Sequence, residues 1–211
     1  MSFTELPERL FIAGTDTDVG KTVVSAILMA GKQAAYWKPV QSGTQETTDS
    51  EWIRRMTGLP DECFVPETYV LSQPLSPHAA AAIDGVCIKL SAFSAPDKET
   101  YPRLIVEGAG GVMVPLNNDH FMIDLIRHLK LSVVLVARSA LGTINHTLMS
   151  LCLLRKKKIP VVGVVMNGPP DKINKDAIET YGQIPVIAEV DRLSRFDLDG
   201  LQKAYIRYFT T

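Results

Sequence analysis

A glycine-bearing segment near the start of the chain constrains its fold more than any other feature. Residues 14–22 read Gly-Thr-Asp-Thr-Asp-Val-Gly-Lys-Thr, with an apolar run at 10–13 before them and a breaker-free apolar segment after them. In such a strand–loop–helix junction, backbone N–H groups and the helix dipole attract a polyphosphate. Lys21 is placed to reach the β- and γ-phosphates, and the Thr22 hydroxyl to bind Mg²⁺. The segment therefore predicts a P-loop that binds a nucleoside triphosphate.

The spacing of this loop differs from the standard pattern. Five residues separate Gly14 from Gly20, whereas the standard loop has four. The alternative is an ordinary strand–turn–helix junction in which Lys21 is only solvated. The phosphate loop is favoured because a second apolar run, at 104–106, ends in an acidic residue, Glu107.

Short apolar runs alternate with helix-forming segments along the chain. The expected strands lie at 10–13, 34–37, 104–106, 133–137, 161–166 and 185–188, and the expected helices at 21–30, 49–56, 122–129 and 143–157. Gly31 is expected to end the first helix. Continuous apolar strands indicate burial on both faces of a mostly parallel sheet. We therefore expect one doubly wound α/β domain of the P-loop NTPase type over residues 1–211, with helices on both faces. The proline-rich stretch 59–102 shows no clear strand and is expected to lie beside the sheet.

Bulk properties exclude several function classes. The formal net charge of the 211 residues is -1, so no broad basic field is expected to hold nucleic acid. No apolar run approaches the roughly 18 residues of a membrane helix, and the N-terminus lacks the pattern of a secretory signal. The three cysteines are widely spaced, so neither a disulfide framework nor a zinc site is expected. The chain is expected to be cytoplasmic.

Two further strand ends carry candidate binding residues. Glu107 begins a Glu-Gly-Ala-Gly segment, and a carboxylate at the tip of a neighbouring strand holds Mg²⁺ in P-loop proteins. Asp49 is a second candidate metal ligand, and an N-cap or first-turn role is equally open to it. Asn167, followed by Gly168, is placed to contact a purine edge or to form a simple turn.

Together these segments resemble the dethiobiotin synthetase family of biotin synthesis, over about residues 9–193. The resemblance rests on the loop at 14–22, Lys-Pro-Val-Gln-Ser-Gly at 38–43, Ser-Pro-His at 76–78, Val-Glu-Gly-Ala-Gly-Gly at 106–111, Gly-Thr-Ile-Asn-His at 142–146 and Asn167. The unusual loop spacing is this family's own version. Asp191 and Arg192 stand where the family often has a proline and an aromatic residue. The family can also use a tyrosine after the adenine-binding asparagine to hold the substrate carboxylate, and Tyr181 is the nearest candidate here.

The resemblance implies an ATP- and Mg²⁺-dependent ligase that closes a urea ring. Its substrates would be 7,8-diaminononanoate, CO₂ and ATP. One amine captures CO₂ as a carbamate, which takes the γ-phosphoryl group to give a carbamic-phosphoric anhydride. The other amine then expels phosphate and yields dethiobiotin. The carbamate and the γ-phosphate are both anions, so bringing them into contact requires charge neutralisation, which lysines and Mg²⁺ can supply.

The resemblance also implies a role for each matching residue. Lys38 would stabilise the carbamate and the transferring phosphoryl group, Ser42 would hydrogen-bond the carbamate or an amine, and Thr17 and Lys21 would act at the reacting phosphate. Without the resemblance, Lys38 would be taken for a solvated strand-end lysine. Thr22, Asp49 and Glu107 would complete the Mg²⁺ shell. The nucleotide would contact Asp18, Val19, Gly20, Lys21, Thr22, Val23, Asp49, Glu107, Gly108, Ala109, Gly110, Asn167 and Gly168.

A predicted helix start at residues 142–145 has a separate implied role. A helix N-terminus attracts anions, and the substrate carries a carboxylate. In the family this helix end, here Gly142, Thr143, Ile144 and Asn145, comes from the other subunit of a homodimer with shared active sites. His146 is expected to be structural or capping. His78 either shapes the diamine site or is a packed loop histidine.

Two other classes of protein remain as alternatives. A ParA/MinD-like switch ATPase would carry an additional lysine in the loop, and residues 15–19 contain none. A cobyrinate-type amidating ligase would need an added glutamine-hydrolysing domain, for which the chain has no room.

Overall fold

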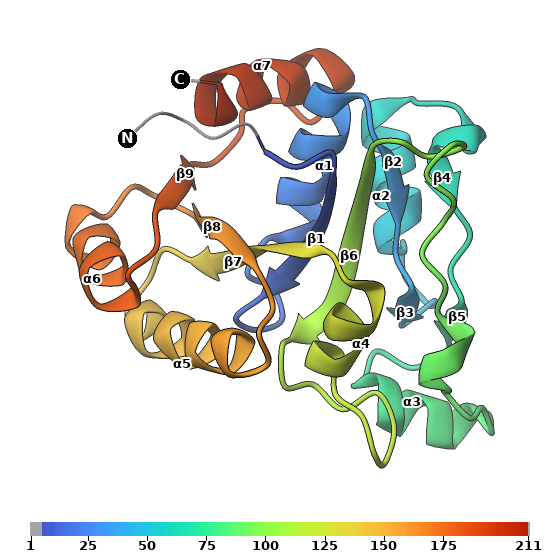
Figure 1. The fold of residues 1–211 in the computed structure, drawn as a ribbon. Helices are drawn as coiled ribbons and strands as arrows, with labels where there is room; N and C mark the ends of the chain where they lie inside the picture. Colours follow the sequence, from blue (N-terminus) through green and yellow to red (C-terminus); the bar gives the residue numbers. More distant parts are fainter. Residues whose placement is uncertain (1–5, 211) are drawn as a thin grey trace.

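A computed structural model describes residues 6–210, and its centre is a seven-stranded sheet whose paired strands are all parallel. The central position of β1, between β6 and β7, puts the phosphate loop near the middle of one sheet edge (Figure 1). In sheet order the strands are β4 (Phe64–Val65), β2 (Ala35–Trp37), β6 (Leu104–Gly111), β1 (Arg9–Gly14), β7 (Ser132–Arg138), β8 (Val161–Asn167) and β9 (Val186–Val190). All six predicted strands are confirmed.

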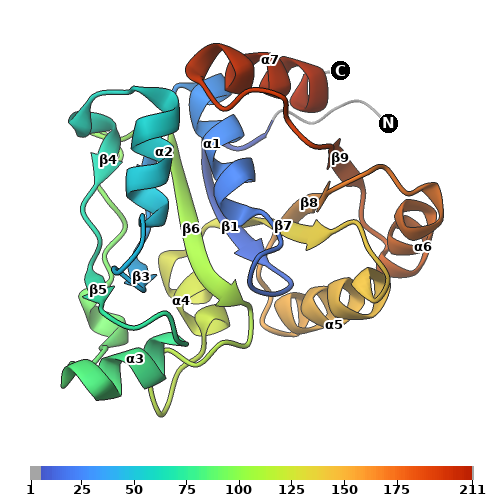
Figure 2. The ribbon, with the colours of Figure 1, turned by 180° about the vertical axis from the view of Figure 1, so that it is seen from behind.

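Helices cover both faces of this sheet, as expected for a doubly wound α/β fold. One core lies under α1 (Lys21–Lys32), α2 (Asp49–Thr57) and α7 (Leu198–Phe209). The other lies under α4 (Met122–Leu129), α5 (Thr143–Lys156) and α6 (Lys172–Gly182). Figures 1 and 2 show the two helical layers from opposite sides. The strands are buried on both faces, which explains why their sequences are continuously apolar.

The first helix is longer than its sequence predicts. Gly31 does not end α1, because the helix continues to Lys32 and ends at Gln33 in the left-handed conformation. A Cβ atom at Gly31 would lie 1.9 Å from Cγ of Tyr205 in α7. The glycine therefore permits close packing of α7 on α1 and is not a helix terminator.

The N-cap of helix α2 is Thr48 and not Asp49. The Thr48 side chain accepts a hydrogen bond from the backbone N–H of Glu51 at 3.2 Å, and the Glu51 carboxylate accepts one from the Thr48 backbone at 2.9 Å. This reciprocal capping box makes Thr48 the N-cap. Asp49 is a first-turn residue, and its carboxylate is free to face the sheet edge.

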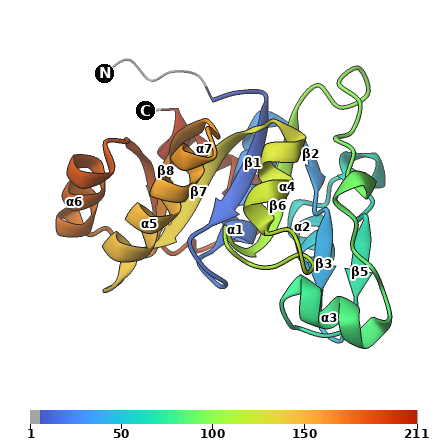
Figure 3. The same ribbon diagram turned by 60° about the horizontal axis from the view of Figure 1, so that its bottom comes forward.

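The proline-rich stretch contains short strands that the sequence did not reveal. Phe64 and Val65 form β4 at the edge of the main sheet, and β5 (Tyr69–Leu71) pairs with β3 (Val40–Ser42) in a separate two-stranded sheet. Helix α3 (Pro77–Asp84) follows, and two single 3-10 turns lie at Asp61–Cys63 and Leu90–Ala92. Figure 3 shows β3, β5 and α3 grouped beyond one side of the main sheet, as expected of an excursion. Strands of two or three residues carry too little periodicity to be recognised.

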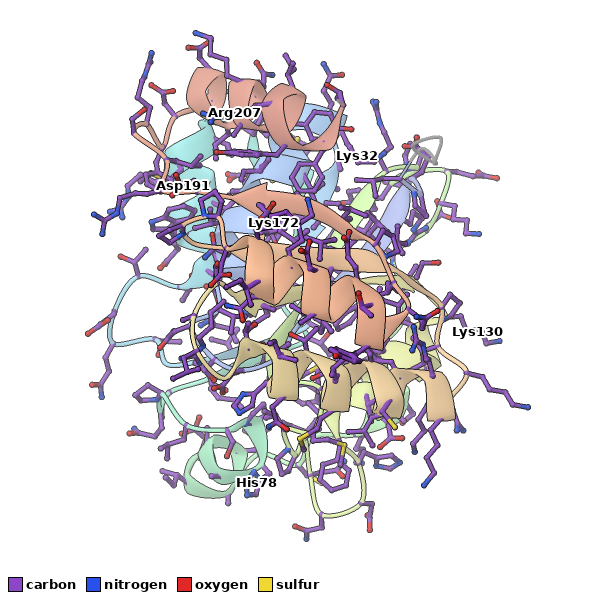
Figure 4. All side chains as sticks on the ribbon, turned by 90° about the vertical axis from the view of Figure 1, so that its left-hand side faces the viewer. Lys32, His78, Lys130, Lys172, Asp191 and Arg207 are labelled. Atoms are coloured by element: carbon purple, nitrogen blue, oxygen red, sulfur yellow. The ribbon has the colours of Figure 1, made fainter. Side chains whose placement is uncertain are left out.

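Helices α6 and α7 were also not predicted. Figure 4 shows α6, with Lys172, running alongside α5, and α7, with Arg207, at the far end from α3 and its His78. Between residues 6 and 210, no helix combines the length and the apolar content that crossing a bilayer requires. The expected lack of a secretory signal concerns an N-terminus whose residues 1–5 lie outside the described part.

Candidate active site

The main cavity lies at the edge of the sheet where β1, β2 and β6 end. It has a volume of about 750 Å³, which suits a cofactor-sized ligand. The carboxyl ends of parallel strands are where doubly wound folds bind ligands. Twelve predicted site residues line it: Thr17, Asp18, Gly20, Lys21, Thr22, Val23, Lys38, Ser42, Asp49, Glu107, Ala109 and Gly110.

The conformation of the phosphate loop depends on its two glycines. A Cβ atom at Gly14 would lie 2.7 Å from the Asp16 carbonyl oxygen and 2.9 Å from Nζ of Lys21. Gly20 has a φ of 94° and is the N-cap of α1, and a Cβ atom there would lie 2.1 Å from Nδ2 of Asn167. Only glycine fits these positions without a shift of neighbouring groups. The turn leaves the helix N-terminus open towards the cavity.

Lys21 folds back over this loop. Its ammonium donates a hydrogen bond to the Asp16 carbonyl at 2.9 Å. Burial, and secondarily the charge of Lys38, lowers the pKa of Lys21 to about 8. A lysine held in this way gains a full counter-charge when an anion enters the loop.

Lys38 lies between the two predicted carboxylate ligands. Its ammonium is 2.7 Å from Oδ2 of Asp49 and 2.9 Å from Oε1 of Glu107, and only 4% of the residue is exposed. Burial alone would lower the pKa of Lys38, but the charges of Glu107 and Asp49 outweigh it and raise that pKa. Burial likewise opposes ionisation of Asp49, yet Lys38 holds the pKa of Asp49 below its ordinary value. Lys38 therefore stays protonated at the mouth of the phosphate loop, where it is paired with two carboxylates.

The Thr22 hydroxyl completes this cluster. Its Oγ1 atom lies 2.6 Å from Oδ1 of Asp49 and 3.0 Å from Oε1 of Glu107. Carboxylate and hydroxyl oxygens are hard donors of the kind Mg²⁺ selects. Within residues 6–210, no three His, Cys, Asp or Glu side chains form a metal-binding group. Two carboxylates and a hydroxyl nevertheless fit Mg²⁺, because this ion keeps several waters and shares phosphate oxygens with its protein ligands.

The sequence did not single out Tyr36, which holds the other side of Glu107. The Tyr36 hydroxyl donates to Oε2 of Glu107 at 3.0 Å, and neither residue is exposed. The strand register explains the pairing: Tyr36 lies opposite Ile105, and Trp37 opposite Val106. Because side chains alternate along a strand, Tyr36 and Lys38 share the face of the sheet on which Ile105 and Glu107 lie. Burial raises the pKa of Tyr36, and the Glu107 charge raises it further.

The opposite wall of the cavity comes from β3 and from the loop before α3. Oγ of Ser42 is buried and has no hydrogen-bond partner among the described residues. Gln41, also missed from the sequence, accepts a hydrogen bond from the Asp49 backbone at 3.3 Å and so links β3 to the start of α2. The other lining residues, for which the sequence predicted no site role, are Pro74, Leu75, Ser76, Pro77 and Val114. Ser76 is the N-cap of α3 and Pro77 its first residue, which is a typical helix start. This pair, part of the Ser-Pro-His segment at 76–78, was the available signal for this wall.

Four predicted nucleotide contacts lie outside the cavity lining or behind it. Val19 is fully buried beneath the loop, and the Gly108 carbonyl accepts from Lys38 at 3.2 Å. Asn167 uses its amide to donate to the Val19 carbonyl at 3.2 Å, which places it against the phosphate loop. Gly168 has a φ of 131°, a value that suits glycine. Asn167 therefore does more than form a simple turn.

The predicted carboxylate site at the start of α5 is separate from the main cavity. Asn145 lines a second cavity of about 430 Å³, whose lining also includes Thr15 and Asp16. Gly142 is the left-handed N-cap of α5, and the buried Oγ1 of Thr143 has no partner in the described part of the chain. His146 is exposed within α5 and does not cap it, contrary to one expectation. Residues 142–145 thus do not line the main cavity of their own chain.

His78 and Tyr181 also lie outside the main cavity lining. His78 is exposed, with Nδ1 3.0 Å from Oγ of Ser76, so it contacts a residue of the cavity wall without lining the cavity. Tyr181 is 72% exposed on α6.

The fold and the loop together define a P-loop nucleotide-binding protein, and the model of an AAA domain family (AAA_26) matches residues 8–197. Curated relatives narrow this class. The chain is 46% identical to the ATP-dependent dethiobiotin synthetase BioD of Rhodopseudomonas palustris (strain BisB18), over 93% of each chain, and 50% identical to that of Paramagnetospirillum magneticum, over 87% of this chain and 88% of the relative. The chain belongs to the family of ATP-dependent dethiobiotin synthetases.

Two other comparisons carry narrower information. The chain is 49% identical to the biotin biosynthesis bifunctional protein BioCD of Bordetella avium over 92% of its own length, but it spans only 42% of that longer protein. The MinC:MinD cell division protein complex of Aquifex aeolicus has a TM-score of 0.53 and 12% identity, over 95% of this chain and 86% of the other. That likeness shows a shared fold alone.

Proposed function

We propose that residues 1–211 form a single P-loop domain and that the chain is a dethiobiotin synthetase that acts on 7,8-diaminononanoate, CO₂ and ATP. The observation that carries the proposal is the position of Lys38. Its ammonium is buried at the mouth of the phosphate loop, opposite the unpartnered hydroxyl of Ser42 in the same cavity. A carbamate and a γ-phosphate brought together there would meet two cations, Lys21 and Lys38, held in place before the reaction.

The proposed reaction has three steps. One amine of the substrate adds to CO₂ and loses a proton, giving a carbamate. A carbamate oxygen then attacks the γ-phosphorus, the bond to the bridging oxygen breaks, and ADP leaves. The second amine attacks the carbamate carbon, phosphate departs with the carbamate oxygen, and the ring closes with loss of a second proton.

Each proposed residue supports one part of this sequence. Lys21 and the N-terminus of α1 bind the phosphates, with Thr17 at the γ-phosphate and Asn167 at the adenine. Lys38 neutralises the carbamate during its approach, and Ser42 orients the carbamate or the amine. Mg²⁺, held by Thr22, Asp49 and Glu107, supplies further charge neutralisation when bound.

Oxygen transfer tests the phosphorylated carbamate directly. With ¹⁸O-labelled bicarbonate as the carbon source, we expect the released phosphate to contain one ¹⁸O atom, because the carbamate oxygen leaves with phosphorus. Mass spectrometry of the phosphate measures this. Unlabelled phosphate formed together with dethiobiotin would rule out phosphoryl transfer to the carbamate.

The homodimer is part of the proposal, and the surface near α5 supports it. Leu141, two residues before the start of α5, is fully exposed, and Met149 of α5 and Met113 are 58% and 45% exposed. Met113 and Met149 line the second cavity together with Asn145. Contiguous exposed apolar side chains mark interaction sites. A second copy docked there would bring residues 142–145 to the cavity of its partner, where the helix N-terminus would bind the substrate carboxylate.

We expect the double substitution Leu141→Glu and Met149→Glu to produce a monomer that has lost most of its activity. Light scattering after gel filtration measures the mass, and the KM for the diamine should rise more than the KM for ATP. The matched control is Ile173→Glu, since Ile173 is 80% exposed on α6 and its substitution should change neither property. A monomer with full activity would refute the shared site.

We also place the protein in the cytoplasm. Cys63, Cys87 and Cys152 are free thiols, as is usual in a reducing compartment.

A further inference from the structure

The two carboxylate oxygens of Glu107 have different partners. Oε1 faces the cavity cluster, where it lies 2.9 Å from the Lys38 ammonium and 3.0 Å from the Thr22 hydroxyl. Oε2 accepts the Tyr36 hydroxyl at 3.0 Å on the buried side. Only one oxygen of this fully buried carboxylate is therefore presented to the nucleotide site.

The position of the Tyr36 ring is fixed by its surroundings. Tyr36 is unexposed and meets Phe64 of β4 edge-on, with the ring centroids 6.3 Å apart. The guanidinium of Arg54, in α2, covers Phe64 at 4.6 Å from its centroid. Strands on both sides of β2 and a helix therefore hold the phenol in place, so it cannot swing away from Glu107 without disturbing packed groups.

We propose that Tyr36 is a positioning residue that makes Glu107 a one-oxygen metal ligand and thereby favours Mg²⁺ over Ca²⁺. The inference rests on the proposed function, because it assumes that Glu107 contributes to a Mg²⁺ site. Ca²⁺ takes more oxygen ligands than Mg²⁺ and commonly binds both oxygens of one carboxylate, whereas Mg²⁺ keeps octahedral geometry with single carboxylate oxygens and water. A carboxylate with one oxygen hydrogen-bonded to a phenol can give Mg²⁺ the single oxygen ligand that it needs. It cannot give Ca²⁺ the second carboxylate oxygen that this ion commonly binds.

The Tyr36→Phe variant tests this inference. It removes one oxygen atom and keeps the ring against Phe64, so the protein is expected to fold. Electron paramagnetic resonance monitors Mn²⁺ bound to the protein in the presence of ADP. Displacement of this Mn²⁺ by Mg²⁺ or by Ca²⁺ gives the affinity of each ion without turnover. We expect the preference for Mg²⁺ over Ca²⁺ to fall by about tenfold, within the range of one hydrogen bond to a charged group.

Two controls separate this inference from its alternatives. Tyr69→Phe removes another phenol, one that accepts from the Lys89 backbone at 3.0 Å, and should leave the ratio of the two affinities unchanged. If Tyr36→Phe weakened both ions equally, Tyr36 would have a structural role only and the inference would be wrong. If Glu107→Gln bound Mn²⁺ like the unaltered protein, the metal assignment in the proposed function would itself fail.

A measurement on the unaltered protein tests the same claim without a substitution. The separation of the two carboxylate stretching bands in the infrared distinguishes one-oxygen from two-oxygen coordination. In protein that contains ¹³C-labelled glutamate, the bands of Glu107 are those that the Glu107→Gln variant lacks. On addition of Mg²⁺, the two stretching bands of the Glu107 carboxylate should show the wide separation that is typical of one-oxygen coordination. The narrow separation of two-oxygen ligation would overturn the inference.

Discussion

Replacement of Lys38 by glutamine is expected to lower kcat by about a thousandfold, the upper part of the range for loss of one preorganised charge-stabilising donor. Lys38 is the cation held at the point where carbamate and γ-phosphate would meet, and its raised pKa keeps it charged. Glutamine retains polar donors but cannot neutralise two approaching anions. The KM for ATP should change little, because Lys21 and the phosphate loop remain in place.

The fold should survive this substitution. Glu107 keeps two other donors, the hydroxyls of Tyr36 and Thr22, and Asp49 is near the cavity surface. Circular dichroism and a cooperative thermal melt check this point. Lys32→Gln is the matched control, since Lys32 is also buried but lies at the other end of α1 and donates to the Leu6 carbonyl (Figure 4). Wild-type kcat in Lys38→Gln would show that its proposed carbamate role is wrong.

Replacement of Lys21 by glutamine is expected to lower kcat/KM by at least about a thousandfold. Unlike the Lys38 substitution, it should also change nucleotide binding. In the proposed site Lys21 binds the phosphates themselves, so nucleotide binding should weaken as well. Titration calorimetry with ADP and Mg²⁺ measures this loss separately from turnover. Unchanged nucleotide affinity together with an unchanged kcat would contradict a phosphate-binding role for Lys21.

The pH dependence of binding gives this prediction a second readout. Because the pKa of Lys21 is lowered to about 8 in the free protein, the ammonium is fully charged only below that pH. Bound phosphate favours the charged form, so above about pH 8 binding must take up a proton. ATP affinity should then fall by up to about tenfold per pH unit. Lys21→Gln should remove both the slope and the proton uptake, and a flat profile in the unaltered protein would contradict the lowered pKa.

The sequence allowed much of this site to be predicted because its parts are local. The phosphate loop follows an apolar strand within a few residues, and Glu107 ends another strand. Parallel strands then bring both ends to one edge of the sheet. The long strands β7 and β8 were recognisable for the same reason, since their apolar runs are continuous.

What the sequence could not give depends on contacts between distant segments. In the sequence, Tyr36 is one residue of an ordinary apolar run. Its contact with Glu107 depends on the register between β2 and β6. Gly31 looks like a helix terminator until α7 is seen to cross it. Ser76 and Pro77 lie at the cavity because they follow a small two-stranded sheet, whose strands have only three residues each. In each case the role comes from tertiary packing and leaves no periodic signal.

The alternative of a ParA/MinD-like switch shares this fold, so sequence identity and chemistry must separate the two. The identity to dethiobiotin synthetases extends over most of the chain, whereas the likeness to the MinC:MinD complex is structural at 12% identity. A switch ATPase hydrolyses ATP without a small-molecule acceptor. The synthetase passes the γ-phosphoryl group to a carbamate.

The dependence of ADP release on the diamine therefore tests the central claim most directly. Purified protein is supplied with ATP, Mg²⁺ and bicarbonate, with and without 7,8-diaminononanoate, and both ADP and dethiobiotin are measured by chromatography. The account predicts one ADP for each dethiobiotin formed and negligible ADP when the diamine is omitted. Release of ADP at the same rate without the diamine, and with no dethiobiotin formed in its presence, would contradict the account and favour the switch.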